Sequence, residues 1–223
     1  MSMTIKEIAD KFPGTVRHFK EKTPIIYQGE VPRCGFFLKK GIVKAYNLHA
    51  NGNEQILRFY GPGEFFPLPW LYGKAATEFY YYEAAENCEV ISVTKQDVDH
   101  IIAHDPELKE YIFQSLLSDQ AALHLRIISL EQPRANEKLE YTLYYLLFRY
   151  GKNIGDEKYV INMHLTHITL ANLVGLTRET ITMEMNKLKR KGVISYSKKV
   201  YKVDRRKLEQ VIGEDNFGDL LGN

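Results

Sequence analysis

Residues 165–191 have the pattern of two short helices joined by a tight turn, and this pattern constrains the fold of the chain more than any other. Thr166 is a natural N-cap, Gly175 supplies the turn, and Thr177 is a second N-cap. After each cap, apolar residues recur at the spacing that buries one face of a helix. The residues expected on the buried faces are Ile168, Leu170, Leu173, Val174, Ile181, Met185 and Leu188. The segment therefore predicts a helix-turn-helix.

The second helix of a helix-turn-helix enters the major groove of DNA with its N-terminus first, so its first two turns meet base edges. Arg178 and Glu179 lie in the first turn, and we expect both to contact bases. Lysines near the end of this helix and in the hairpin after it are expected to contact phosphates. The predicted DNA-binding residues are Thr166, His167, Thr177, Arg178, Glu179, Thr182, Met183, Asn186, Lys187, Lys189 and Lys198.

The charge of the chain is concentrated around this motif. Residues 166–207 contain eleven Lys and Arg against three Asp and Glu, a net charge of +8, although the whole chain carries only +2. Lysine and arginine release counterions when they neutralise phosphates, so such a cluster favours nucleic-acid binding whatever the base sequence. The alternative is a solvated charged face, which is the usual fate of a charge run.

Residues 23–93 are predicted to be all-β. Short apolar and aromatic runs alternate with glycine turns, and Asn51-Gly52 is a strong signal for a tight hairpin. Turn signals about ten residues apart indicate a small barrel or roll. The expected strands cover residues 24–27, 36–38, 42–48, 55–60, 80–85 and 89–93.

Residues 107–132 contain neither Gly nor Pro, and Asp105-Pro106 before them suits a helix start, so one long helix is expected. One stripe of small residues on this helix comprises Ser115, Ser118, Ala122, Leu125 and Ser129. An apolar stripe, interrupted by Asp119 and Arg126, comprises Ile112, Leu116, Leu123 and Leu130. We expect one stripe to pack on the roll and the other on a second copy of the chain.

Beyond Pro133 the pattern predicts a helix over 136–149, a strand over 158–163 and a hairpin over 193–203, so the helix-turn-helix belongs to a winged helix. The fold class is therefore α+β. The expected domains are a β-roll over residues 1–105, a dimerisation helix over 106–132 and a winged helix-turn-helix over 133–223.

This order of parts resembles the CRP/FNR family of bacterial transcription factors, named after the cyclic-AMP receptor protein and the fumarate-nitrate regulator. The resemblance covers nearly the whole chain. It is most specific in LTHITLANLVGLTRETI at residues 165–181, and it extends to YQGE at Tyr27, KKGIVK at Lys39, NGNE at Asn51 and GPGEFF at Gly61. It implies a roll of the cyclic-nucleotide-binding type, a homodimer on a pseudo-palindromic double-stranded DNA operator, and RNA polymerase as a further partner.

The family often carries RETVxR in the second helix, and its Arg and Glu contact guanine and cytosine. Arg178 and Glu179 match those two residues, which the resemblance implies are base readers. Met183 stands where the last Arg is expected. Methionine offers only apolar contact, for example to a thymine methyl, so the base preference at that step departs from the family pattern.

The sensor part also departs from the family. Counting back from Cys88, the Arg-Ser pair that meets the cyclic phosphate in nucleotide-binding members is replaced by Glu78 and Phe79. A carboxylate repels a phosphate, so we predict that cyclic AMP is not bound. The surrounding rings could hold a small uncharged effector, or they could form the core of the roll. The candidate effector pocket comprises Glu64, Phe66, Trp70, Phe79, Tyr80 and Tyr82.

Several other classes of function are not supported by the sequence. No run approaches the roughly eighteen apolar residues of a membrane span, and residues 1–10 lack the apolar region of a signal peptide, so a cytoplasmic protein without membrane contact is expected. Cys34 and Cys88 are expected to be reduced, with a redox switch as the alternative, and His100 and His104 are expected on a surface helix.

No catalytic motif is present, so no enzyme activity, metal or cofactor is expected. A DNA-binding regulator is the predicted function. The alternative is a ligand-binding roll that serves as an interaction module without binding DNA.

Overall fold

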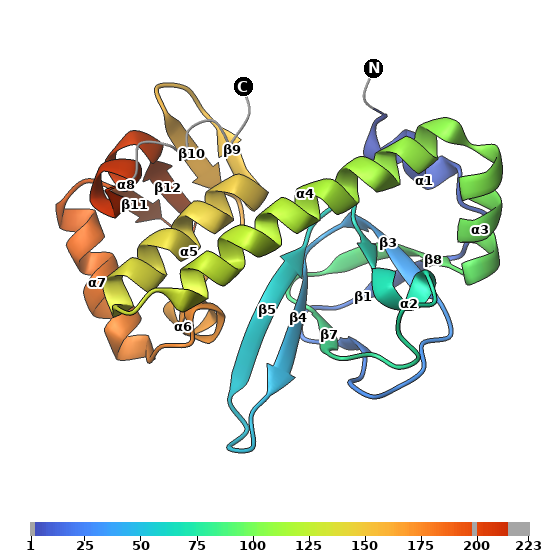
Figure 1. Ribbon diagram of the computed structural model, residues 1–223, viewed down its shortest axis with the longest axis horizontal. Helices are drawn as coiled ribbons and strands as arrows, with labels where there is room; N and C mark the ends of the chain where they lie inside the picture. The colour runs from blue at the N-terminus through green and yellow to red at the C-terminus, as the bar shows by residue number, and fades with distance from the viewer. Residues whose placement is uncertain (1–2, 198–199, 214–223) are drawn as a thin grey trace. The chain divides into compact units, whose positions relative to one another are not determined.

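The computed structural model describes residues 3–197 and 200–213 (Figure 1). The chain divides into two compact units, residues 1–117 and 118–223. In Figure 1 the first is coloured blue to green and the second green-yellow to red, and the long helix α4 passes from one to the other. Among the described residues, no helix is long and apolar enough to cross a membrane.

Two four-stranded antiparallel sheets form the first unit, which confirms the predicted roll. One sheet has the order β1-β8-β3-β6, with bounds Val16–Phe19, Cys88–Val93, Gly35–Lys40 and Phe65–Phe66. The other has the order β2-β7-β4-β5, with bounds Pro24–Ile26, Tyr81–Ala84, Val43–Leu48 and Glu54–Tyr60. The short strands β1 and β6 are additions that the sequence pattern did not predict.

Alternation along the strands divides the apolar side chains of this unit between two cores. Phe36 and Leu38 of β3 belong to a core with residues of both sheets, whereas Phe37 between them belongs to a second core. Full burial of a Phe side chain such as Phe37 contributes roughly 1.5–3 kcal/mol. The second core also receives residues from the helices α1 (Ile5–Asp10), α2 (Leu68–Leu71) and α3 (Lys95–His104).

The hairpin predicted at Asn51-Gly52 is confirmed, because it joins β4 to β5. Gly52 has a φ of +82°, a conformation that favours glycine, and its N–H donates to the carbonyl of His49 at 2.8 Å. The strands end at Leu48 and begin again at Glu54, so the connection is longer than a two-residue turn.

The long helix α4 runs from Pro106 to Glu131, which confirms the predicted helix with each end one residue earlier. The Asp105 carboxylate accepts a hydrogen bond from the N–H of Leu108 at 2.9 Å and so caps the helix. Leu108 and Ile112 are buried in the second core of the first unit. Ile112 therefore does not belong to a stripe that faces a partner, because its side chain already packs within the roll unit.

Asp119 and Arg126, the two residues that interrupt the apolar rhythm of α4, are buried within the second unit. Asp119 pairs with Arg149 of α5 (Ala135–Tyr150), and Arg126 donates to the carbonyl oxygen of Leu173. The small-residue stripe shares this buried face through Ala122, Leu125 and Ser129. These residues pack within the second unit, where the two buried charged side chains find their partners.

The second unit is a winged helix-turn-helix, as predicted. Its helices after α5 are α6 (His167–Val174), α7 (Arg178–Arg190) and α8 (Arg205–Ile212). An antiparallel sheet of order β11-β12-β10-β9 has the bounds Ile194–Ser197, Val200–Asp204, Lys158–Ile161 and Gly151–Asn153. The hairpin β11–β12 is the wing.

Candidate nucleic-acid interface

Side-chain caps begin both helices of the helix-turn-helix. The Thr166 hydroxyl accepts the N–H of Thr169 at 3.1 Å, and the Thr177 hydroxyl accepts the N–H of Thr180 at 3.2 Å. Gly175 has a φ of +77° and donates its N–H to the carbonyl of Ala171. These bonds satisfy backbone groups that helix ends leave unpaired, and they set the angle between α6 and α7 locally.

The predicted buried faces are confirmed except at one position. Leu170, Leu173, Val174, Ile181, Met185 and Leu188 are all at most 3% exposed. Ile168 is instead 51% exposed. It lies in the first turn of α6, where its side chain borders the pocket described below and does not reach the core.

The outer face of α7 presents a mixed set of side chains to solvent. Arg178 and Glu179 are exposed in its first turn, as are Met183 and Asn186 further along. Met183 is 51% exposed, so its side chain is available for contact with an apolar group outside the chain.

Thr182, which the sequence places among the DNA-binding residues, already has partners inside the protein. Its hydroxyl donates to the carbonyl oxygen of Arg178 at 2.8 Å, and its oxygen lies 2.8 Å from Nδ1 of His167. The His167 ring thus connects the first residue of α6 to the second turn of α7. Both side chains hold the two helices together, so Thr182 is a poor candidate for direct base contact.

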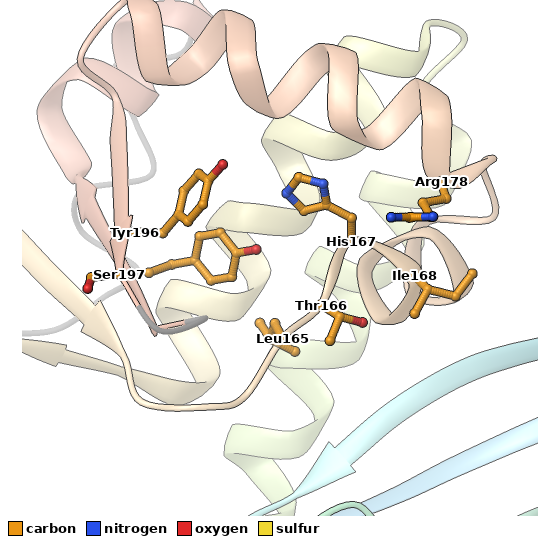
Figure 2. A pocket seen from close by; sticks show the side chains of 8 residues that line it. Leu165, Thr166, His167, Ile168, Arg178, Tyr196 and Ser197 are labelled. Carbon is orange, nitrogen blue, oxygen red and sulfur yellow. The ribbon is translucent and has the colours of Figure 1, made fainter.

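A pocket of about 750 Å³ opens between the start of α6, the start of α7 and the wing (Figure 2). The His167 ring lies edge-on to Tyr196 of β11, with ring centres 6.1 Å apart, and Tyr196 packs at 5.4 Å against Tyr201 of β12. The ammonium of Lys189 sits 4.9 Å from the Tyr196 ring centre. The residues that line the pocket are Leu165, Thr166, His167, Ile168, Arg178, Tyr196, Ser197 and Tyr201.

The sequence pattern did not indicate Tyr196, Ser197 or Tyr201 as functional residues. Tyr196 and Tyr201 face each other across the wing. The two tyrosines could have been predicted as part of the site, because they lie in a predicted hairpin that directly follows the predicted DNA-binding helix.

The three predicted phosphate-binding lysines differ in their surroundings. Lys187 lies 2.8 Å from the carboxylate of Glu184, which is only 6% exposed, so part of its charge is neutralised within α7. Lys189 is exposed beside Tyr196. Lys198 lies outside the described residues.

Two ionisable groups behind and beside α7 have altered pKa values. Burial raises the pKa of Glu140 in α5 to about 7, and the nearby carboxylates of Glu137 and Glu184 also raise it. Burial lowers the pKa of His167, and the positive charge of Arg178 lowers it further. The imidazole of the protein alone is therefore neutral at neutral pH.

The residues of the candidate effector pocket do not form one cluster. Phe66 and Tyr82 stack in the core between the sheets, at 5.6 Å, whereas Trp70 lies in the second core. Phe79 is 59% exposed, and Tyr80 is partly buried. Glu64 pairs with Arg58 at 2.7 Å. Apart from the exposed Phe79, these rings lie in or against the two cores of the roll.

Apolar side chains remain exposed along α4. Leu116, Leu123 and Leu130 of the predicted dimer stripe are 39%, 37% and 40% exposed. They continue a stripe with three further exposed side chains: Phe113, Leu117 and Ile127.

Two family models match this chain, and their bounds follow the two parts of the fold. Residues 16–105 match the cyclic nucleotide-binding domain, and residues 137–211 match the Crp-like helix-turn-helix domain. A roll of the cyclic nucleotide-binding type joined by one helix to a Crp-like helix-turn-helix domain defines a class of DNA-binding transcription regulators.

Individual relatives agree. The chain is 27% identical over 189 residues to the global nitrogen regulator of Nostoc, and the match covers 84% of each protein. It is 28% identical over 181 residues to the cyclic AMP receptor protein of Thermus thermophilus, and the match covers 80% of this chain and 78% of that one. The crystal structure of a CRP/FNR-family transcriptional regulator from Thermus thermophilus is 25% identical, with a TM-score of 0.67 over 90% of this chain and 99% of that one. The chain belongs to the CRP/FNR family and is a DNA-binding transcriptional regulator.

Proposed function

We propose that the chain is a homodimer that reads a pseudo-palindromic operator with α7 and that its roll does not bind cyclic AMP. It acts in the cytoplasm, catalyses no reaction and has RNA polymerase as a protein partner. The proposal that α7 reads DNA is supported by the exposed first turn of this helix. Arg178 and Glu179 are exposed there, within a segment of net charge +8. This arrangement suits bidentate contact of Arg178 with guanine and acceptance by Glu179 from cytosine.

The homodimer is supported by the exposed apolar stripe on α4. Large side chains from Phe113 to Leu130 lie on one side of a single helix, and a continuous apolar stripe of this kind is usually covered by another protein surface. Pairing with the same stripe of a second copy would bury it in the manner of a coiled coil. Two copies would then present two α7 helices to two half-sites about one helical turn apart.

The absence of cyclic AMP binding is proposed because of Glu78. A relative at 28% identity is named a cyclic AMP receptor protein. In this chain, Glu78 is 3% exposed and its carboxylate accepts a hydrogen bond from Tyr82. The other oxygen of Glu78 is buried and has no hydrogen-bond partner among the residues that the structure describes. An acidic group in such surroundings disfavours an anionic ligand, so any effector of the roll would be uncharged.

Selection of bound fragments from random duplexes would identify the operator, and fluorescence anisotropy on operator and random duplex then tests the roles on α7. Arg178→Ala should cost about 1–3 kcal/mol on the operator and much less on random duplex. Lys189→Ala should weaken binding to the operator and to random duplex about equally. It should also reduce the slope of log K against log salt concentration by about 1, as expected for the loss of one phosphate contact. Equal losses on both duplexes for Arg178→Ala would show that Arg178 does not read bases.

A further inference from the structure

The hydrogen bonds around Thr182 determine which nitrogen of His167 carries a proton. A hydroxyl has one hydrogen, and Thr182 donates it to the carbonyl oxygen of Arg178 at 2.8 Å. The contact of 2.8 Å between the Thr182 oxygen and His167 Nδ1 therefore requires Nδ1 to be the donor. In the neutral ring, Nε2 is then an unprotonated acceptor.

His167 Nε2 lies on the pocket side of the ring. Figure 2 shows the imidazole projecting from the start of α6 into the space between α7 and Tyr196. Within the described residues, Nε2 has no hydrogen-bond partner. The same pocket is lined by Tyr196 and Tyr201, whose phenol groups can donate hydrogen bonds. A group with oxygen acceptors could therefore be held there by several donors at once, but only if Nε2 carried a proton.

The charges around His167 are positive or neutral. Arg178 approaches it from α7, Tyr196 from β11 and Tyr201 from β12, and Lys189 lies over the Tyr196 ring. Burial raises the pKa of Tyr201 to about 12, so that phenol stays neutral at physiological pH. Burial and Arg178 both disfavour the imidazolium in the protein alone. An anion placed in the pocket would reverse this balance, because a nearby negative charge favours the charged ring.

We propose that His167 takes up a proton from solvent when duplex DNA binds, and that its imidazolium then donates from Nε2 to a backbone phosphate while Nδ1 holds Thr182. The inference rests on the proposed function. His167 is in this view both a phosphate contact and a positioning residue for α7. The contact reads no base, so it operates on random duplex as well as on the operator.

The consequence is that affinity for DNA rises as the pH falls. The pKa of His167 in the protein alone and its higher pKa in the complex limit a window of pH. Within this window, the complex holds one more proton than the separate protein and DNA. Across that window the affinity should increase by up to about tenfold per pH unit, and above it the dependence should vanish. The lower limit of the window lies below the ordinary histidine pKa, because burial and the charge of Arg178 lower the pKa of His167 in the protein alone.

The test is fluorescence anisotropy of a 30-base-pair random duplex, at constant ionic strength, from about pH 5.5 to 8. His167→Gln should lose the rise in affinity at low pH, because an amide can donate to Thr182 but does not titrate. His167→Arg, with a permanent charge, should bind at pH 8 more tightly than the wild type and show little pH dependence. The matched control is His164→Gln, an exposed histidine three residues away and outside the pocket, which should keep the wild-type dependence.

An NMR titration of the His167 imidazole should give a higher pKa with the duplex than without it. An unchanged pKa, or equal pH dependence for His167→Gln and His164→Gln with normal binding, would overturn this inference alone. Failure of the wild type to bind any duplex at any pH would overturn the proposed function and this inference together.

Discussion

The hydroxyl of Tyr82 donates a hydrogen bond of 3.2 Å to the buried carboxylate of Glu78. Burial raises the pKa of Glu78, and the negative charge of Glu30 adds to this effect, although the bond from Tyr82 opposes it. Tyr82 also stacks on Phe66 in the core between the two sheets. A ligand phosphate near Glu78 and Tyr82 would therefore lie close to a carboxyl group and to aromatic rings.

Cyclic AMP should neither bind nor change operator affinity. The reason is the carboxylate of Glu78, which repels a phosphate at the place where a positive charge would be needed. Isothermal titration at micromolar protein should show no saturable heat, and the cyclic AMP receptor protein of Thermus thermophilus is the positive control. Trp70, the only tryptophan, offers a second readout, and a saturable change in its fluorescence coupled to tighter operator binding would contradict the prediction.

Glu140→Gln should stabilise the protein at pH 8 relative to the wild type. The pKa of Glu140 is raised to about 7 by burial, so between about pH 4.5 and 7 the folded state holds a proton that the unfolded state releases. Wild-type stability therefore falls as the pH rises through this window, by an amount on the order of 2–3 kcal/mol. Glutamine does not ionise and avoids this loss.

Urea unfolding at pH 5 and pH 8 measures the effect of Glu140→Gln. The advantage of the variant over the wild type should grow between the two pH values. Glu131→Gln, which alters an exposed carboxylate at the end of α4, is the control and should behave as the wild type at both. A constant difference across the pH range would mean that Glu140 is ionised throughout.

Asp119→Ala should destabilise the second unit by about 3–5 kcal/mol, because it leaves the buried guanidinium of Arg149 without this carboxylate. Both side chains of the pair are only 11% exposed. Arg134→Ala breaks a pair with Glu137 in which the arginine is 77% exposed, so it should cost less than about 1 kcal/mol. Urea unfolding measures the free energy of unfolding of both variants. Similar small losses in the two variants would show that the buried pair contributes little to stability.

Leu123→Glu should convert the dimer to a monomer and abolish tight operator binding. A charge at the centre of the exposed α4 stripe cannot be buried against a second copy without a large desolvation cost. Val31→Glu is the matched control, because Val31 is also an exposed apolar residue, at 64%, but lies outside α4. Sedimentation at micromolar concentration gives the oligomeric state. A wild-type monomer that still binds a palindrome tightly would refute the dimer.

Features that depend on neighbouring residues could be predicted from the sequence. The helix-turn-helix is predicted from Thr166, Gly175 and Thr177. The two caps and the left-handed turn need only hydrogen bonds to backbone groups a few residues away. The absence of Gly and Pro over residues 107–132 likewise predicts α4. The chemistry of the α7 surface follows from the same local pattern, since residues on the outer face of a short helix need no distant partner.

Features that depend on which elements pack together were decided only by the tertiary structure. Ile112 is buried and Ile168 exposed, although both fit an apolar helical rhythm, because burial requires a facing element. Asp119 and Arg126 interrupt the rhythm of α4, yet they are buried, because their partners come from α5 and α6.

The order of a β-roll, a long helix and a winged helix could be predicted from the residues alone, because these elements follow from spacing and local hydrogen bonds. Tertiary structure alone decided that His167 meets Thr182, fifteen residues away, and that Tyr196 closes the pocket beside them. Such contacts join α6, α7 and the wing, and the periodicity of a single segment does not encode its distance from another.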